Sequence, residues 1–203
     1  MAKKRNAPPT KLGKRVPPGG RGQGRKAVRK VKSPRGEPGA KVSNQGVVNT
    51  GGVDSAIVCA LDLARKGIPV FPCKPDKRPY TSNGFKAATV DEAKIRRWWE
   101  VHPDALVGVP TGQASGINVI DLDLKGATIE DRLASLPETL PATRVHTTRS
   151  GGRHYLFKAT APVKSRANVM PGVDTRGNGG YIVWWPAHGC NVIEGALART
   201  PEW

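Results

Sequence analysis

Gly116-Ile-Asn-Val-Ile-Asp-Leu-Asp-Leu-Lys125 is the stretch from which the fold of this chain can be argued. Residues 117–120 form a short, mostly apolar run after a glycine, which predicts a buried strand. Asp121 and Asp123 follow, and side chains two residues apart on a strand point to the same face. Their charges repel, and a divalent cation relieves that repulsion because Mg²⁺ and Mn²⁺ prefer carboxylate oxygens. The stretch therefore predicts a metal site at a strand end, although a D-x-D pair also arises by chance on a solvated strand end.

Outward from this stretch, the charge of the chain is unevenly distributed. Of a formal net charge of +17, residues 1–50 hold 14 Lys/Arg and one acid, whereas residues 51–203 hold 19 Lys/Arg and 15 acids. The first segment is rich in Gly and Pro, cannot bury enough apolar surface to offset its conformational entropy, and is expected to be a disordered basic tail. We interpret it as a nucleic-acid-binding arm, with a solubilising leader as the alternative. Residues 51–203 are expected to form one catalytic domain.

Cysteine usage and hydropathy indicate a cytoplasmic protein. The three cysteines are an odd number without C-x-x-C spacing, which favours reduced thiols in the cytosol. No run of 18 apolar residues and no apolar signal-peptide core occurs, so neither a membrane span nor a signal peptide is expected.

Periodicity and turn signals predict alternating helices and strands. The helices are expected after Val53 with an end at Gly67, after a capping box at 89–92, and over 127–136. The strands are expected at 68–72, 106–109, 117–120, 144–148, 154–158 and 181–185, with 144–148 and 154–158 forming a hairpin. Strands separated by helices, with hairpins later in the chain, indicate an α/β or α+β sheet domain.

Three further motifs carry groups that suit a phosphate or a metal. Residues 74–79 (K-P-D-K-R-P) form a basic, proline-stiffened loop, in which Lys77 and Arg78 suit a phosphate clamp, with a solvated turn as the alternative. Residues 173–177 (V-D-T-R-G) supply a third carboxylate, Asp174, and a guanidinium, Arg176, that can bind phosphate oxygens bidentately.

The third motif is a glycine-rich turn that precedes a histidine. In residues 150–154 (S-G-G-R-H), the turn Ser150-Gly151-Gly152 allows backbone amides and the imidazole of His154 to approach a phosphate. Taken alone, His154 is more simply explained as a structural histidine.

The order of these motifs resembles a known family, the bifunctional DNA primase/polymerase (prim-pol) domain of the archaeo-eukaryotic primase superfamily. The resemblance runs from about Ala56 to Trp203. Besides the basic loop and the Trp98-Trp99 helix, it rests on these stretches: 67–72 (G-I-P-V-F-P), 107–112 (V-G-V-P-T-G), 115–123 (S-G-I-N-V-I-D-L-D), 150–157 (S-G-G-R-H-Y-L-F) and 174–183 (D-T-R-G-N-G-G-Y-I-V).

The resemblance implies a fold, an activity and a set of site residues. The implied fold is an RRM-like sheet packed with a smaller α/β module. The implied activity is DNA-dependent primase/polymerase: two-metal nucleotidyl transfer from NTPs or dNTPs on a single-stranded DNA template during replication, with Mg²⁺ or Mn²⁺. Asp121, Asp123 and Asp174 would bind the metals, His154 would contact the triphosphate, and Arg176 would have a nucleotide or phosphate role.

The chain departs from the family pattern in two places. Residues 184–188 are Trp-Trp-Pro-Ala-His where relatives often have Pro-Pro-Ser, which puts the local substrate contacts in question. The sequence contains no P-loop motif, so we expect either a stand-alone enzyme or an excised domain, with a separate replicative helicase as a candidate partner.

Two other functions fit parts of the sequence. A metal-dependent nuclease would use the D-x-K pattern of Asp123 and Lys125 with Asp104 as an upstream acid, but it leaves Asp174, His154 and the glycine turn unexplained. A non-catalytic nucleic-acid-binding module with a basic arm would have no need of three acids in one site.

Overall fold

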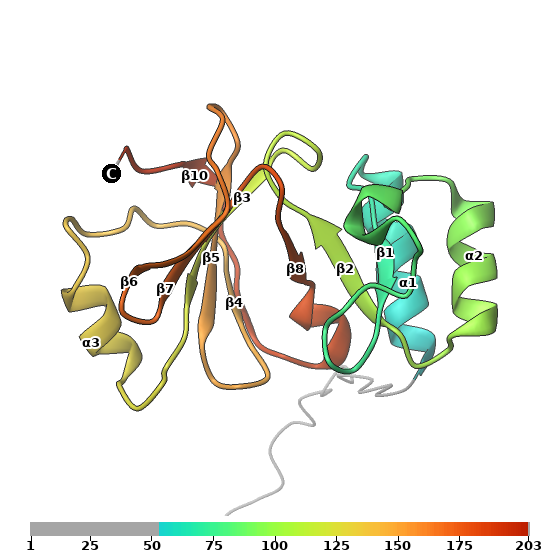
Figure 1. Cartoon of the computed structure of the whole chain (residues 1–203), viewed down its shortest axis with the longest axis horizontal. Helices are drawn as coiled ribbons and strands as arrows, with labels where there is room; N and C mark the ends of the chain where they lie inside the picture. Colours follow the sequence, from blue (N-terminus) through green and yellow to red (C-terminus); the bar gives the residue numbers. More distant parts are fainter. Residues whose placement is uncertain (1–52, 203) are drawn as a thin grey trace, which may run out of the picture. The chain divides into compact units, whose positions relative to one another are not determined.

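The computed structural model describes residues 53–202, which form an α+β protein with three α-helices and two sheets (Figure 1). The predicted disordered tail at 1–50 and its predicted nucleic-acid role lie outside the described residues. Strand pairing is antiparallel except between β10 (Ala198–Arg199) and β5 (Arg153–Lys158), so the alternation of helices and strands produces an α+β fold rather than a parallel α/β sheet.

The smaller sheet has three strands, in the order β1 (Phe71–Cys73), β2 (Leu106–Pro110) and β8 (Tyr181–Val183). The strand predicted at 68–72 begins later than expected, at Phe71. Pro72 is accommodated because β1 lies at the edge of this sheet, where its neighbouring strand is β2.

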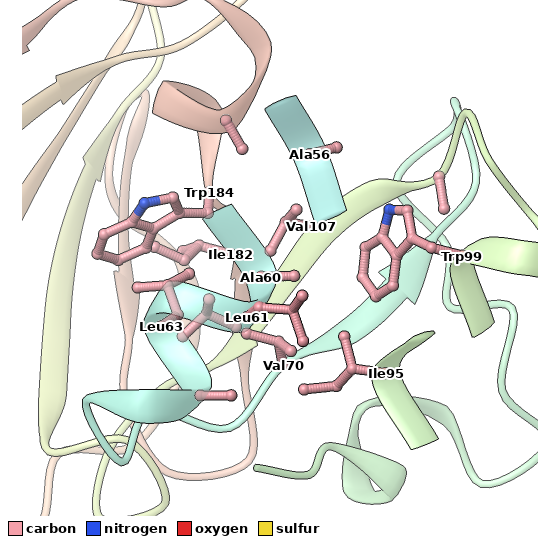
Figure 2. Packing of buried hydrophobic residues seen from close by; sticks show 14 of the residues in the cluster. Ala56, Ala60, Leu61, Leu63, Val70, Ile95, Trp99, Val107, Ile182 and Trp184 are labelled. Atoms are coloured by element: carbon pink, nitrogen blue, oxygen red, sulfur yellow. The ribbon is translucent and has the colours of Figure 1, made fainter. Parts of the chain in front are cut away.

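Two helices, α1 (Val53–Arg65) and α2 (Glu92–Val101), pack beside this small sheet. Apolar residues spaced three and four apart on α1, such as Ala60, Leu61 and Ala64, are buried against Ile95 and Trp99 of α2 (Figure 2). The cap of α2 differs from the prediction. The Asp91 side chain accepts hydrogen bonds from the backbone N–H groups of Ala93 at 2.9 Å and Lys94 at 3.2 Å, so Asp91 is the N-cap and the predicted box with Thr89 does not form.

The larger sheet has seven strands, and β3 (Ile117–Leu122) lies at its centre. Its order is β6 (Arg166–Met170), β7 (Val173–Arg176), β3, β5, β4 (Val145–Thr147) and β9 (Val192–Ile193), with β10 also pairing with β5. The predicted strand at 117–120 and the predicted hairpin are therefore confirmed, the hairpin as β4 and β5.

The two faces of the large sheet pack against different partners. Ile120, Leu122 and Phe157 share one face and form an apolar cluster with α3 (Ile129–Ala134). Val119 and Leu156 point to the other face and join the cluster that contains α1 and Trp184. Neighbouring residues of β5 therefore fall into different clusters, because the side chains of a strand alternate between its two faces.

Two elements in the C-terminal half, α3 and β8, have boundaries that differ from the predictions. α3 is shorter than the predicted 127–136 helix, because Thr128 caps it in a capping box with Asp131. The strand predicted at 181–185 ends at Val183, and Trp185–His188 form a 3₁₀ helix with Pro186 in its first turn. The chain thus leaves the small sheet immediately after β8.

Two further observations concern the cysteines and the lengths of the helices. All three cysteines are free. Within residues 53–202, no helix is long and apolar enough to cross a membrane.

Candidate active site

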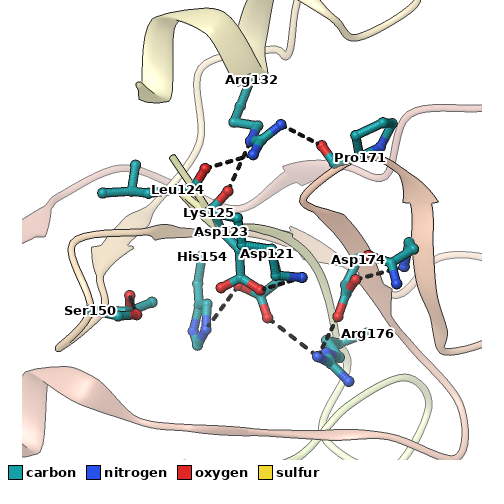
Figure 3. A network of polar contacts seen from close by, with 12 residues as sticks. Asp121, Asp123, Leu124, Lys125, Arg132, Ser150, His154, Pro171, Asp174 and Arg176 are labelled. Carbon is teal, nitrogen blue, oxygen red and sulfur yellow. Dashed lines mark hydrogen bonds and ion pairs between the residues drawn. The ribbon is translucent and has the colours of Figure 1, made fainter. Parts of the chain in front are cut away.

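A row of polar side chains crosses the large sheet on the face that packs toward α1. His146 on β4 is paired in register with His154 on β5, His154 with Asp121 on β3, and Asp121 with Asp174 on β7. Paired residues on antiparallel strands point to the same face, so four chain segments contribute to one row. Figure 3 shows three of these side chains, Asp121, His154 and Asp174, lying close together. The structure therefore brings three of the predicted site residues onto one surface.

Asp121 lies at the centre of this row, in surroundings that disfavour its charge. Its pKa is raised to about 6, mainly by burial, then by the negative charge of Asp123, with a further contribution from Asp174. The positive charges of Arg176 and Lys77 act in the opposite direction. The surroundings of Asp121 therefore disfavour its charge, and a bound cation would relieve both the repulsion and the desolvation.

His154 is buried and neutral at pH 7. Its pKa is lowered to about 3, mainly by burial and also by the neighbouring His146, Arg176 and Lys77. Its Nε2 atom lies 3.5 Å from Oδ1 of Asp121 and points toward that carboxylate (Figure 3). This distance is longer than that of a typical hydrogen bond. A neutral imidazole at this position can donate one N–H to an anion in the site.

Asp174 and Arg176 form the tightest ion pair of the site. Nη2 of Arg176 lies 2.6 Å from Oδ2 of Asp174 and 3.5 Å from Oδ2 of Asp121, so the guanidinium bridges two carboxylates. The other oxygen of Asp174 accepts the backbone N–H of Asn168 at 2.7 Å. Arg176 thus occupies a position where positive charge satisfies both acids at once.

Asp123 lies just beyond the end of β3, where α3 holds the backbone in place. Its Oδ2 is 3.3 Å from Nζ of Lys125, and its carbonyl accepts from Nε of Arg132 at 2.9 Å (Figure 3). Arg132 also donates to the carbonyls of Leu124 at 2.6 Å and Pro171 at 2.8 Å, joining the two segments that carry Asp123 and Asp174. Arg132 was not predicted as a site residue, because its role depends on backbone carbonyls that no sequence pattern identifies.

Backbone strain is concentrated around these acids. Within the described residues, three non-glycine residues have positive φ: Lys77 at 73°, Lys125 at 44° and Asn168 at 51°. Lys125 pairs with Asp123, and Asn168, in a bulge between β6 and β7, donates to Asp174. Such conformations cost free energy and cluster at functional sites, so their placement supports a functional role for this region.

A cavity of about 280 Å³ opens beside the polar row. The small sheet forms one wall through β8, and the large sheet forms the other. Six of its lining residues carry the chemistry: Lys77, Asp121, His154, Arg176, Tyr181 and Trp185. The cavity therefore combines one acid, a neutral imidazole and two cations, a combination that suits an anionic ligand held beside a metal.

Trp185 lies in the cavity wall, and its indole ring contacts two cationic side chains that come from different loops. Nζ of Lys77 lies 5.5 Å from the centre of the indole ring system, and Cζ of Arg149 lies 5.1 Å from it. Lys77 was predicted as a phosphate contact, whereas Arg149 and Trp185 were not. The departure from the family pattern at 184–188 was the available signal, because it drew attention to the tryptophans.

Four predicted nucleotide-binding residues do not line this cavity. Arg78 is exposed and pairs with Asp76 at 2.6 Å. In the turn, the hydroxyls of Ser150 and Thr148 lie 3.1 Å apart, and the N–H of Gly151 donates to the carbonyl of Thr148 at 3.0 Å. That amide is occupied within the turn, so a phosphate contact through it would require the turn to open.

Gly152 has a steric role at the end of β3. A Cβ atom at this position would lie 2.4 Å from the carbonyl oxygen of Leu122, a distance that real side chains do not reach. The glycine is therefore required by the close packing of the turn against β3, next to Asp123.

The predicted metal ligands fit a divalent cation by their chemistry, although they do not converge on one point. Among residues 53–202, no three His, Cys, Asp or Glu side chains form a group that could hold a metal ion. Asp174 faces Arg176, and Asp123 faces Lys125. The donors are nonetheless all carboxylate oxygens, and the pKa of Asp121 is raised first by burial and then by the negative charges of Asp123 and Asp174. The metal-ligand assignment stays a prediction.

Two histidines and two aspartates thus form one row on the large sheet, beside a cavity lined by Lys77 and Arg176, and these groups suit an anionic ligand. Residues 60–203 match the model of the bifunctional DNA primase/polymerase N-terminal domain, called Prim-Pol, and the chain belongs to this family. No curated protein matches the chain. Family membership associates it with primase and polymerase activity, hence with nucleotidyl transfer on DNA and nucleotide substrates, and such domains typically depend on metal ions.

Proposed function

We propose that this chain is a DNA-dependent primase/polymerase that transfers nucleotidyl groups from NTPs or dNTPs onto a growing strand on a single-stranded DNA template during replication. The observation that carries the proposal is the row of His154, Asp121 and Asp174 beside a cavity that also contains Lys77 and Arg176. A nucleoside triphosphate needs cations for its phosphates and carboxylates for its metal ions, and this surface offers both. The finer fold proposal, an RRM-like sheet with a smaller module, agrees with the two sheets.

The chain's own residues would perform the binding and positioning. Lys77 and Arg176 would neutralise phosphate charge, and His154 would donate one N–H to a phosphate oxygen. Arg176 bridges Asp121 and Asp174, and its guanidinium would be free to turn toward the phosphates once these acids hold a metal ion.

Asp121, Asp123 and Asp174 are the residues that would hold Mg²⁺ or Mn²⁺. When bound, such ions lower the pKa of the attacking 3′-hydroxyl and neutralise charge on the pyrophosphate leaving group. The buried walls beside Asp121 strengthen electrostatic interactions there, because they exclude water.

The test is an incorporation assay with single-stranded template, labelled nucleotides and Mg²⁺ or Mn²⁺, with and without a primer. We expect template-dependent incorporation that EDTA abolishes and that added metal restores. No incorporation by the full chain under any of these conditions would overturn the proposal.

The same assay separates the two alternatives. A metal-dependent nuclease would shorten the labelled template, and it would need Asp104, which is exposed and lies outside the cavity lining. A non-catalytic binding module would retain the template without changing it. Either result would assign the acids a role other than nucleotidyl transfer.

A further inference from the structure

Two buried imidazoles lie side by side behind the proposed phosphate site, and each has a nitrogen without a partner. His146 on β4 and His154 on β5 are paired in register, and both are buried. Five buried side-chain polar atoms in the described part of the chain lack a hydrogen-bond partner, and two of them are the Nδ1 atoms of these histidines. Buried polar atoms are normally satisfied, so two unsatisfied atoms on paired residues call for an explanation.

Arg144 determines which nitrogen of His146 carries the proton. Nε of Arg144 donates to Nε2 of His146 at 2.9 Å. Because the guanidinium is always protonated and has no acceptor, Nε2 of His146 must present a lone pair. A neutral His146 then carries its hydrogen on Nδ1. The unpartnered atom of His146 is therefore a donor.

The surroundings of His146 hold this arrangement in place. The His146 ring meets Trp184 edge-on, with ring centres 4.5 Å apart and an angle of 79°. Nη1 of Arg144 is itself anchored by Glu194 at 2.5 Å. Packing on one side and an ion pair on the other oppose rotation of the imidazole.

The unpartnered atom of His154 has the complementary character. Its Nε2 faces a carboxylate oxygen of Asp121 at 3.5 Å, and an ionised carboxylate can only accept. The favoured tautomer of His154 thus carries its hydrogen on Nε2, which leaves Nδ1 as an acceptor. The two unpartnered atoms are therefore one donor and one acceptor on adjacent, register-paired residues.

We propose that His146 is a positioning residue whose Nδ1–H is linked to Nδ1 of His154 through one water molecule, and so keeps His154 in the tautomer that points Nε2–H into the active site. The resulting chain runs from Glu194 through Arg144 and His146 to His154. In the opposite tautomer, His154 would present a lone pair to Asp121 and to an incoming phosphate oxygen, and both contacts would be repulsive. The inference rests on the proposed function only for the identity of the anion.

Nitrogen-15 NMR of the histidine side chains tests the tautomer without any assay of activity. The chain has four histidines, and the two tautomers of a neutral imidazole differ in the shifts of Nδ1 and Nε2. We expect His154 in the parent protein to carry its hydrogen on Nε2. In His146→Leu, which fills the space without a donor, we expect the His154 signals to move toward a mixture of tautomers. Unchanged His154 signals in His146→Leu would overturn the inference.

A matched pair of polar variants separates hydrogen bonding from packing. The amide N–H of Asn in His146→Asn can take the place of Nδ1–H, whereas the longer Gln of His146→Gln carries its amide near the position of Nε2. We expect His146→Asn to keep the His154 tautomer and to keep the nucleotide KM within about threefold. We expect His146→Gln and His146→Leu to raise KM about tenfold, the upper end of the effect of one hydrogen bond, with a smaller change in kcat. Equal KM values in all three variants would overturn the inference.

Failure of the proposed function gives a different result. If the parent protein incorporates no nucleotide, the primase/polymerase proposal falls, whereas the NMR comparison of His146→Leu with His146→Asn still decides whether His146 sets the tautomer of His154.

Discussion

The two faces of the large sheet are built from the same strands but have different compositions. On the face toward α3, Leu122, Phe157 and Val173 are buried and apolar. On the face toward α1, Val119 and Leu156 are apolar, but the next row along the strands consists of His146, His154, Asp121 and Asp174.

The comparison indicates that the polar row lowers the stability of the fold relative to the apolar face. Burying acids and imidazoles is unfavourable unless they are paired, and the polar row buries two imidazoles and one carboxylate with a raised pKa. The apolar face compensates by ordinary packing against α3. We therefore expect substitutions on the polar row to change activity and substitutions on the apolar face to change stability.

The largest expected effect is that of Asp121→Asn on turnover. Removal of one predicted metal-binding charge should lower kcat by about a thousandfold or more, corresponding to several kcal/mol of transition-state stabilisation. The free energy of unfolding should not fall, because the surroundings of Asp121 disfavour its charge. Steady-state incorporation and urea denaturation measure the two quantities. Asp104→Asn, at an exposed acid outside the cavity lining, is the control, and comparable turnover in the two variants would contradict the assignment.

Phe157→Ala is the opposite case on the apolar face. The side chain is fully buried, so its truncation should cost about 3–5 kcal/mol of unfolding free energy. The nucleotide KM of the molecules that remain folded should change little. Urea denaturation compared with the exposed Lys158→Ala variant of the same strand measures the cost. A loss below about 1 kcal/mol would show that this face is not a tightly packed core.

A smaller effect, on the nucleotide KM, is expected for substitution of Trp185, whose ring contacts Lys77 and Arg149. Trp185→Phe keeps an aromatic ring but weakens both cation–π contacts, each of which contributes about 0.5–2 kcal/mol. The nucleotide KM should therefore rise several-fold, by roughly 3- to 10-fold on that scale. Trp98→Phe, which weakens a contact with Lys94 at 5.0 Å, is the matched control. If both variants shift KM equally, the loop cations do not act on the nucleotide.

The smallest effect concerns the helix that covers the apolar face. Thr128 caps α3, with its hydroxyl accepting the N–H of Asp131 at 3.1 Å. Thr128→Ala should lower the unfolding free energy by about 1 kcal/mol and leave incorporation unchanged. A change in kcat with unaltered stability would instead link α3 to the acids, and Arg132 would be the connecting residue.

Local pattern was sufficient to predict the strand at 117–120 and the hairpin of β4 and β5. Each depends on neighbouring residues, since alternation and turn residues act over a few positions. The same reasoning predicted the capping residue of α2 wrongly, because Thr89 and Asp91 both suit a helix start and the geometry of the entering chain selects Asp91.

The sequence by itself determined which residues alternate, where turns occur and that residues 1–50 are strongly basic. Only the tertiary structure decided that β7 lies beside β3, which brings Asp174 next to Asp121 across more than fifty residues of chain. It also decided that Lys77 and Arg149 meet on Trp185, that Arg176 bridges two acids, and that His146 lies behind His154. The physical reason is that side-chain periodicity specifies the face of a strand but not its partner, whereas register, burial and charge in a site arise only after distant strands have paired.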